Sequence, residues 1–169
     1  MKIGDKVIYP NQGLSVIEAI REESYNGEAS KMIHLRIIAN NTLVQISSST
    51  ATEIGIRRPV SEGTIRKIFN FIRNEPVDVT MDWKGRYKEH LNLMKSGTLF
   101  DVATVLKSLY YLSLIKPLSF REKKMLEKAK ELLICEISEA TDVPSGKIEH
   151  RLLETLARSF KDAKPRIAI

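Results

Sequence analysis

Short apolar runs alternate with turn residues along the first sixty positions. The runs are rich in β-branched residues and predict strands over residues 6–9, 14–20, 31–38 and 43–46. Asn26-Gly27 lies between two of these strands and is a strong hairpin signal, because both central positions of a type I′ turn need a positive φ. Four or five strands with tight turns predict a small twisted antiparallel sheet or SH3-like barrel.

The period of the apolar positions becomes helical after Pro59. Four apolar residues follow the i, i+3, i+4, i+7 spacing that places side chains on one helix face: Ile65, Ile68, Phe69 and Ile72. Glu75-Pro76 predicts the end of this helix. A second helix is expected from Asp82, whose carboxylate can cap free amides, to Ser96-Gly97.

Three more helices follow. An apolar stripe over residues 99–110 predicts the third, Ser119 and Glu122 form a capping-box sequence ahead of the fourth, and apolar residues repeating every four positions predict a fifth over residues 145–163. The fold class is therefore α+β. We expect an N-terminal antiparallel β domain over residues 1–59 and an all-α domain of about five helices over residues 60–169.

The charge of the chain adds a candidate partner. The 169 residues carry 27 Lys and Arg against 21 Asp and Glu, a formal net charge of +6. Residues 1–60 hold 7 basic and 6 acidic side chains, a net charge of +1. Residues 61–169 hold 20 basic and 15 acidic side chains, a net charge of +5. This balance permits a polyanionic partner and favours the helical domain as its contact.

Other compositional features exclude whole classes of protein. No apolar run approaches the roughly 18 residues that span a bilayer, and the start lacks the apolar core of a signal peptide, so we expect a cytoplasmic, nucleoid-associated protein with no membrane partner. The single cysteine, Cys135, cannot form an internal disulfide and is expected to be a buried or half-buried inert thiol.

The residues give little sign of catalysis. The chain contains no dinucleotide, P-loop or nucleophile-elbow motif, and His34, His90 and His150 lie in different elements without metal-ligand spacing. We therefore expect no enzyme activity, no catalytic residues, no metal, no cofactor and no small-molecule substrate.

Trp83 is the only tryptophan and permits two interpretations. On a helix it shares a face with Tyr87, Leu91 and Met94, so it can extend a core stripe. It also lies in the first turn, flanked by Lys84, Lys88 and Arg86, where an exposed indole could wedge against unstacked bases while the cations hold phosphates. The spacing alone leaves both interpretations open.

A second group of basic residues opens the fourth predicted helix. It comprises Arg121, Lys123, Lys124, Lys128 and Lys130. Such a run is usually a solvated helix face. Its first members follow a capping box, so free amides and cations lie near one another, which also suits a phosphate.

Several short motifs, taken in order, resemble the CarD/CdnL family of bacterial transcription regulators. They are residues 4–13 (GDKVIYPNQG), 55–57 (GIR), 83–88 (WKGRYK), 96–97 (SG), 118–119 (LS) and 122–129 (EKKMLEKA). The resemblance covers about residues 1–140. It implies a Tudor-like RNA polymerase interaction domain, shared with transcription-repair coupling factors, followed by a DNA-contacting helical domain.

The resemblance also implies site residues and partners. The helical domain would meet promoter DNA, with little sequence specificity, at the upstream edge of the melted region. Trp83 matches the family's wedge, and we expect it to contact DNA together with Lys84, Arg86, Lys88, Lys123 and Lys124. The N-terminal domain would bind the polymerase β subunit. Glu23 and Gln45 occupy positions where family members can carry polymerase-facing arginines, and Arg21 or Lys31 is a candidate to compensate.

Two alternatives remain open. The chain could be an adaptor that binds polymerase or another protein without touching DNA, which salt-dependent DNA affinity would distinguish. It could also be an enzyme that uses a cleft between the domains, for which clustered carboxylates or histidines would be the sign.

Overall fold

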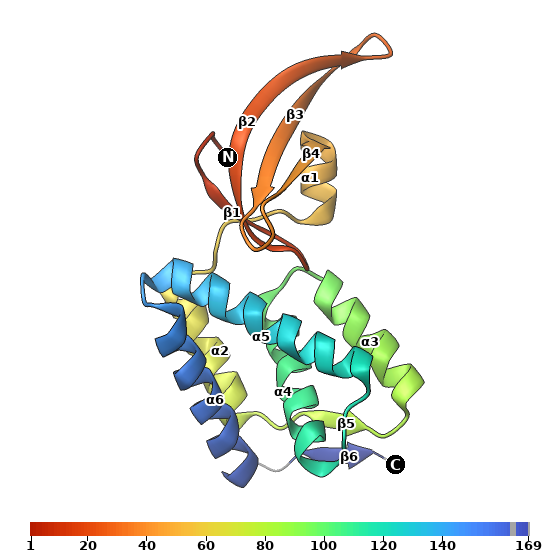
Figure 1. The fold of residues 1–169 in the computed structure, drawn as a ribbon, viewed down its shortest axis with the longest axis vertical. Helices are drawn as coiled ribbons and strands as arrows, with labels where there is room; N and C mark the ends of the chain where they lie inside the picture. The colour runs from red at the N-terminus through yellow and green to blue at the C-terminus, as the bar shows by residue number, and fades with distance from the viewer. Residues whose placement is uncertain (163–164, 169) are drawn as a thin grey trace. The chain divides into compact units, whose positions relative to one another are not determined.

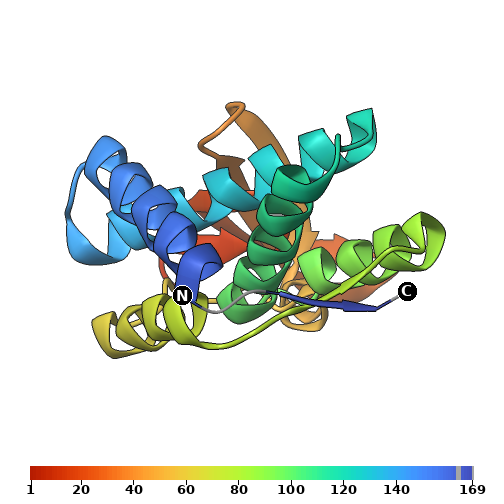
Figure 2. The ribbon, with the colours of Figure 1, turned by 90° about the horizontal axis from the view of Figure 1, so that it is seen from below.

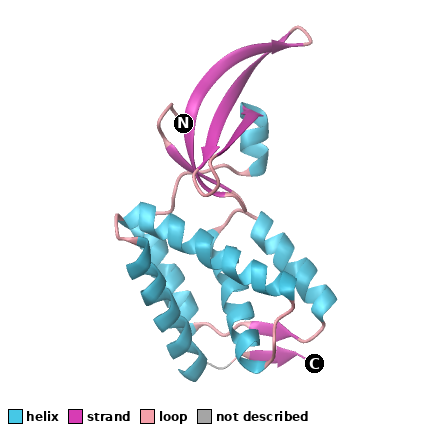
Figure 3. Ribbon diagram, in the orientation of Figure 1, coloured by secondary structure: helices cyan, strands magenta, loops and turns pink. Residues whose placement is uncertain are grey.

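The chain divides into two compact units, Met1–Pro59 and Val60–Ile169. The computed structural model describes residues 1–162 and 165–168. Figure 1 shows the course of the chain, and Figure 3 the distribution of helix and strand.

The N-terminal unit is a strongly curved four-stranded antiparallel sheet, as the apolar runs predicted (Figure 1). The strands are β1 (Lys6–Tyr9), β2 (Gly13–Tyr25), β3 (Glu28–Ile37) and β4 (Thr42–Ser47), in the spatial order β1-β2-β3-β4. β2 and β3 are longer than predicted. Asn26 and Gly27 join them with φ of 53° and 83°, so the predicted type I′ geometry is confirmed.

One face of this sheet holds the core of the unit. Val7, Ile17 and Leu35 are fully buried there, and a short helix, α1 (Ser48–Ile54), adds Ala51 to the same cluster. The sequence did not indicate α1, because its seven residues show no apolar period. Its signals are its caps: Ser47 Oγ accepts from the amide of Thr50, and Gly55 closes the helix at a φ of 83°.

The C-terminal unit contains the five expected helices. They are α2 (Glu62–Asn74), α3 (Trp83–Lys95), α4 (Leu99–Ile115), α5 (Phe120–Thr141) and α6 (Ser145–Asp162). Residue 163, the last of the predicted fifth helix, lies outside the described residues. The α2 stripe is confirmed, since Ile65, Ile68, Phe69 and Ile72 are all buried.

The α4 helix is the centre of this unit, with the α2 and α6 pair on one side and α3 on the other (Figure 2). The sequence predicted one apolar stripe, but the helix is buried on most of its circumference, including Val105, Ser108 and Tyr111. Tyr110, which was placed in the stripe, is only half-buried.

Lys107 is the unexpected member of the α4 core, because its side chain is fully buried. Its Nζ donates hydrogen bonds to the carbonyl oxygens of Phe71, at 3.3 Å, and Glu75, where α2 ends. The ammonium group therefore satisfies the carbonyl of Glu75 at the end of α2 and adds a second donor to the carbonyl of Phe71, which already accepts from the amide of Glu75. Burial lowers the pKa of Lys107 to about 8.

Two short strands, which the sequence analysis did not include, complete the unit. β5 (Asp78–Thr80) pairs in parallel with β6 (Arg166–Ala168), and Arg166 Nε lies 2.9 Å from Asp78 Oδ1. β5 directly precedes α3, so this pairing fixes the segment that leads into the wedge candidate. Across the part of the chain that the structure describes, no helix is long and apolar enough to span a membrane.

Candidate nucleic-acid interface

Trp83 is the first residue of α3, and 57% of it is exposed. The core interpretation of this residue is therefore wrong. Asp82 caps the helix, its carboxylate accepting from the amides of Lys84 at 3.3 Å and Gly85 at 3.2 Å. Gly85 makes room for the cap, because a Cβ there would lie 2.7 Å from Asp82 Oδ2. The turn that carries the indole is thus fixed by its own cap.

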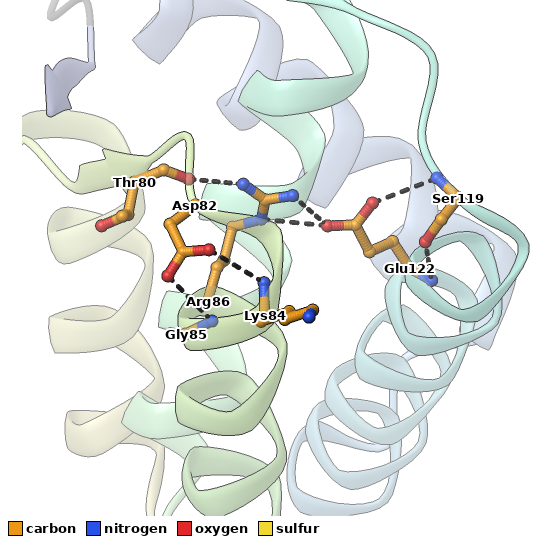
Figure 4. A network of polar contacts seen from close by, with 7 residues as sticks. All are labelled: Thr80, Asp82, Lys84, Gly85, Arg86, Ser119 and Glu122. Atoms are coloured by element: carbon orange, nitrogen blue, oxygen red, sulfur yellow. Dashed lines mark hydrogen bonds and ion pairs between the residues drawn. The ribbon is translucent and has the colours of Figure 1, made fainter. Parts of the chain in front are cut away.

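Arg86, one turn later, is buried and holds α3 against α5 (Figure 4). Its Nε donates to Glu122 Oε1 at 2.9 Å, its Nη2 donates to the same oxygen, and its Nη1 donates to the carbonyl of Thr80 at the end of β5. This arrangement corrects the expectation for Arg86: its donors are used inside the fold, so it positions the helices and offers no free cation to DNA.

Glu122 serves two purposes with one carboxylate. Its Oε1 atom accepts the hydrogen bonds from Arg86, and its Oε2 atom accepts one from the amide of Ser119 at 3.0 Å. In return, Ser119 Oγ accepts a hydrogen bond from the amide of Glu122 at 3.2 Å. The predicted capping box is therefore confirmed. Burial raises the pKa of Glu122, but the hydrogen bonds from Arg86 and Ser119 outweigh burial and hold the pKa below its ordinary value.

The histidines do not form a metal site. Among the residues described, no group of three or more His, Cys, Asp or Glu side chains could hold a metal ion. His90 is buried beside the Arg86 network, where burial, and then the charge of Arg86, lower its pKa to about 4. It is neutral at physiological pH.

The remaining cations predicted to bind DNA are exposed. Lys84 and Lys88 lie on α3, and Lys123 and Lys124 lie in the first turns of α5. The Arg86–Glu122 contact joins the fourth residue of α3 to the third residue of α5, so the structure brings both groups to neighbouring helix starts. The later part of the basic run differs: Lys130 pairs with Glu127 at 2.8 Å and with Glu149 at 3.6 Å.

Aromatic side chains accompany these cations. Lys84 Nζ lies 5.7 Å from the ring centroid of Trp83, Arg121 Cζ lies 5.9 Å from that of Tyr87, and Lys124 Nζ lies 4.5 Å from that of Phe120. Phe120 is 71% exposed and was missed by the sequence analysis. Its signal was available: it directly follows the N-cap Ser119 and stands outside the inward stripe of α5.

The residues predicted to contact polymerase lie on the outward face of the N-terminal sheet. Gln45 Nε2 on β4 lies 3.1 Å from both carboxylate oxygens of Glu23 on β2, so the two side chains form one polar group. Arg21 is exposed two residues before Glu23 on the same strand, and therefore on the same face. Further along this face, Arg36 is held by Glu18 at 2.6 Å and 2.9 Å.

Cys135 departs from expectation, because it is exposed rather than buried or half-buried. Partial desolvation, followed by the charges of Glu131 and Glu139, raises the pKa of its thiol. The protonated thiol is the weaker nucleophile, which agrees with the expected lack of reactivity.

Family models match both units of the chain. The model described as "CarD-like/TRCF RID domain" matches residues 1–59, and that described as "CarD, C-terminal domain" matches residues 67–153. A relative named "Putative transcription factor YdeB", from Bacillus subtilis (strain 168), is 32% identical over 136 residues, or 80% of this chain and 89% of the relative. The solution structure of the 72-residue N-terminal domain of Myxococcus xanthus CarD aligns with 34% of this chain and 77% of that domain, with 28% identity and a TM-score of 0.30.

Proposed function

Because this chain belongs to the CarD family of transcription factors, we propose that it binds the β subunit of RNA polymerase and stabilises the open promoter complex. The N-terminal unit makes the polymerase contact, and the starts of α3 and α5 meet the upstream edge of the melted DNA. The protein acts by binding and catalyses no reaction.

The exposure of Trp83 is the observation that carries the proposal. A large apolar ring that is 57% exposed on a capped first turn contributes little to the core, and it stands beside exposed lysines. Such a ring can insert at a step where bases are already unstacked, while Lys84, Lys88, Lys123 and Lys124 contact the phosphates. A ring reads the geometry of the fork more readily than base identity, so little sequence specificity is expected.

The mechanism is a shift in a two-state equilibrium. A protein that binds the melted promoter more tightly than the closed one favours opening by the difference in the two binding free energies. A difference of about 1.4 kcal/mol would shift the equilibrium about tenfold. No covalent step is needed.

The polymerase contact is proposed for the outward face of β2, β3 and β4. Arg21, Glu23 and Gln45 lie on this face, and the family match covers the whole unit. Since Gln45 donates to Glu23, the pair offers a net negative group with Arg21 nearby. A partner surface with a cation opposite Glu23 fits this pattern.

The test is the lifetime of the open complex with Trp83→Ala. The variant should leave the free energy of unfolding nearly unchanged, because the side chain is exposed, and should retain polymerase binding while it shortens the lifetime. Leu153→Ala on α6 is the matched control, since it removes an apolar side chain that is 38% exposed. An unchanged lifetime with Trp83→Ala would reject the wedge.

A further inference from the structure

We propose that Trp83 is one end of a stacking surface for unpaired nucleotides that also includes Tyr87 and Phe120. We call these three rings, with Lys84, Arg121 and Lys124, the aromatic strip. This inference rests on the proposed contact of Trp83 with DNA and adds the class of ligand, which is single-stranded DNA rather than a duplex.

The strip spans the starts of two helices and is joined across them by Arg121. Tyr87 lies four residues after Trp83 on α3 and so shares its side of the helix. Arg121 of α5 lies over the Tyr87 ring at 5.9 Å, and Phe120 is its immediate neighbour in the chain. Lys124, one turn later, covers Phe120 at 4.5 Å. Tyr87 is half-buried against the core of the unit, so the exposed rings of the strip are Trp83 at the start of α3 and Phe120 at the start of α5.

The charges of the strip are available to a ligand. Within the described ranges 1–162 and 165–168, Lys84, Arg121 and Lys124 form no ion pair with a carboxylate and instead lie over aromatic rings. Arg86, at the centre of the same region, is neutralised by Glu122. The strip thus presents positive charge outward while the balanced pair stays inside.

The exposure of Phe120 has no explanation in the fold. Burying a phenylalanine side chain stabilises a fold, yet this one is 71% exposed at the start of α5. Aromatic rings interleaved with cations are the feature by which proteins bind single strands, because every unpaired base offers a face for stacking and the cations follow the phosphates. A duplex hides those faces and would leave Phe120 unused.

The strip is also preorganised. The Arg86–Glu122 ion pair joins its two helices, and the caps at Asp82 and Ser119 fix the two first turns. The backbone is therefore already ordered before a ligand binds, so binding carries no entropy cost for ordering it.

The experiment measures binding of the full chain to fluorescent oligo(dT), to a duplex of equal length and to a forked duplex at one low salt concentration. Phe120→Leu keeps an apolar side chain and removes the aromatic face, while Phe120→Trp restores one. We expect Phe120→Leu to weaken oligo(dT) binding about tenfold, Phe120→Trp to retain it, and both to leave duplex binding within about twofold of wild type. Leu153→Ala should change none of the three.

The outcomes separate the inference from the proposed function. The strip is rejected if Phe120→Leu leaves oligo(dT) binding unchanged, or if it weakens oligo(dT) binding and duplex binding equally. It is also rejected if the wild-type protein does not bind oligo(dT) more tightly than the duplex. If Trp83→Ala still weakens fork binding in that case, the wedge stands without the strip. If Phe120→Leu weakens oligo(dT) binding but Trp83→Ala leaves the open-complex lifetime unchanged, the strip stands and the wedge falls.

Discussion

Arg86 and Glu122 form a buried ion pair that joins the first turn of α3 to the capping box of α5. The pair connects residues that are 36 positions apart in the chain. It joins the start of α3, which carries Trp83, to the start of α5, which carries Arg121, Lys123 and Lys124, and neither member of the pair is exposed.

Removing one member of this pair should be costly. Arg86→Met leaves a buried carboxylate with only Ser119, and Glu122→Gln leaves a buried guanidinium without a countercharge, so each should lower the free energy of unfolding by about 3–5 kcal/mol. The double variant Arg86→Met/Glu122→Gln should lose clearly less than the sum of the two. Urea unfolding of the four proteins measures this coupling, and additive losses would show that the two side chains act independently.

The buried Lys107 should make stability rise with pH in the alkaline range. Its pKa is about 8 in the folded protein against 10.5 in the unfolded chain, so the unfolded chain binds more protons between these values and stability increases from about pH 8 to pH 10.5. Urea unfolding at steps across this range should show the rise in wild type and lack it in Lys107→Met. The exposed Lys95→Met is the control and should keep the wild-type profile.

The closeness of Gly85 to the Asp82 cap predicts an interaction between two substitutions. Gly85→Ala improves helix propensity by about 1 kcal/mol but pushes its Cβ against Asp82 Oδ2, so in wild type the two effects should nearly cancel. In the Asp82→Ala background the clash is gone, and Gly85→Ala should stabilise by about 1 kcal/mol. Equal effects of Gly85→Ala in both backgrounds, measured by urea unfolding, would contradict this geometry.

Neutralising exposed lysines should reduce the salt dependence of DNA binding. Each phosphate contact contributes about 0.7–0.9 to the slope of log K against log salt, so Lys88→Met/Lys123→Met should make the slope shallower by about 1.5. Lys130→Met, which removes a lysine already paired with glutamates, should leave it unchanged. An adaptor that makes no DNA contact would show the same slope for all three proteins.

Local patterns were enough to predict most of the fold. The Asn26-Gly27 turn, the stripe on α2 and the capping box at Ser119 each depend on residues within a few positions of one another, and the structure confirms all three. The helix α1 was missed because a short helix with strong caps has no apolar period to detect.

The errors at the candidate site came from contacts between distant parts of the chain. In the sequence Arg86 is one cation of a basic motif, and its partner Glu122 lies far away in the chain. Lys107 interrupts an apolar stripe, and the carbonyl groups that accept its hydrogen bonds belong to a different part of the chain. Phe120 is a different case: its position outside the inward stripe of α5 could be read from the sequence, but the degree of its exposure is known only from the structure.

One carboxylate shared between two helix starts also limits how the region opens. When the first turn of α5 frays, Glu122 leaves Arg86 at the same time, and the turn of α3 that bears Trp83 loses its anchor. Amide hydrogens at both starts should therefore exchange with solvent through a common opening event. The indole at the start of α3 and the lysines at the start of α5 are therefore kept in place, or released, as one cooperative unit.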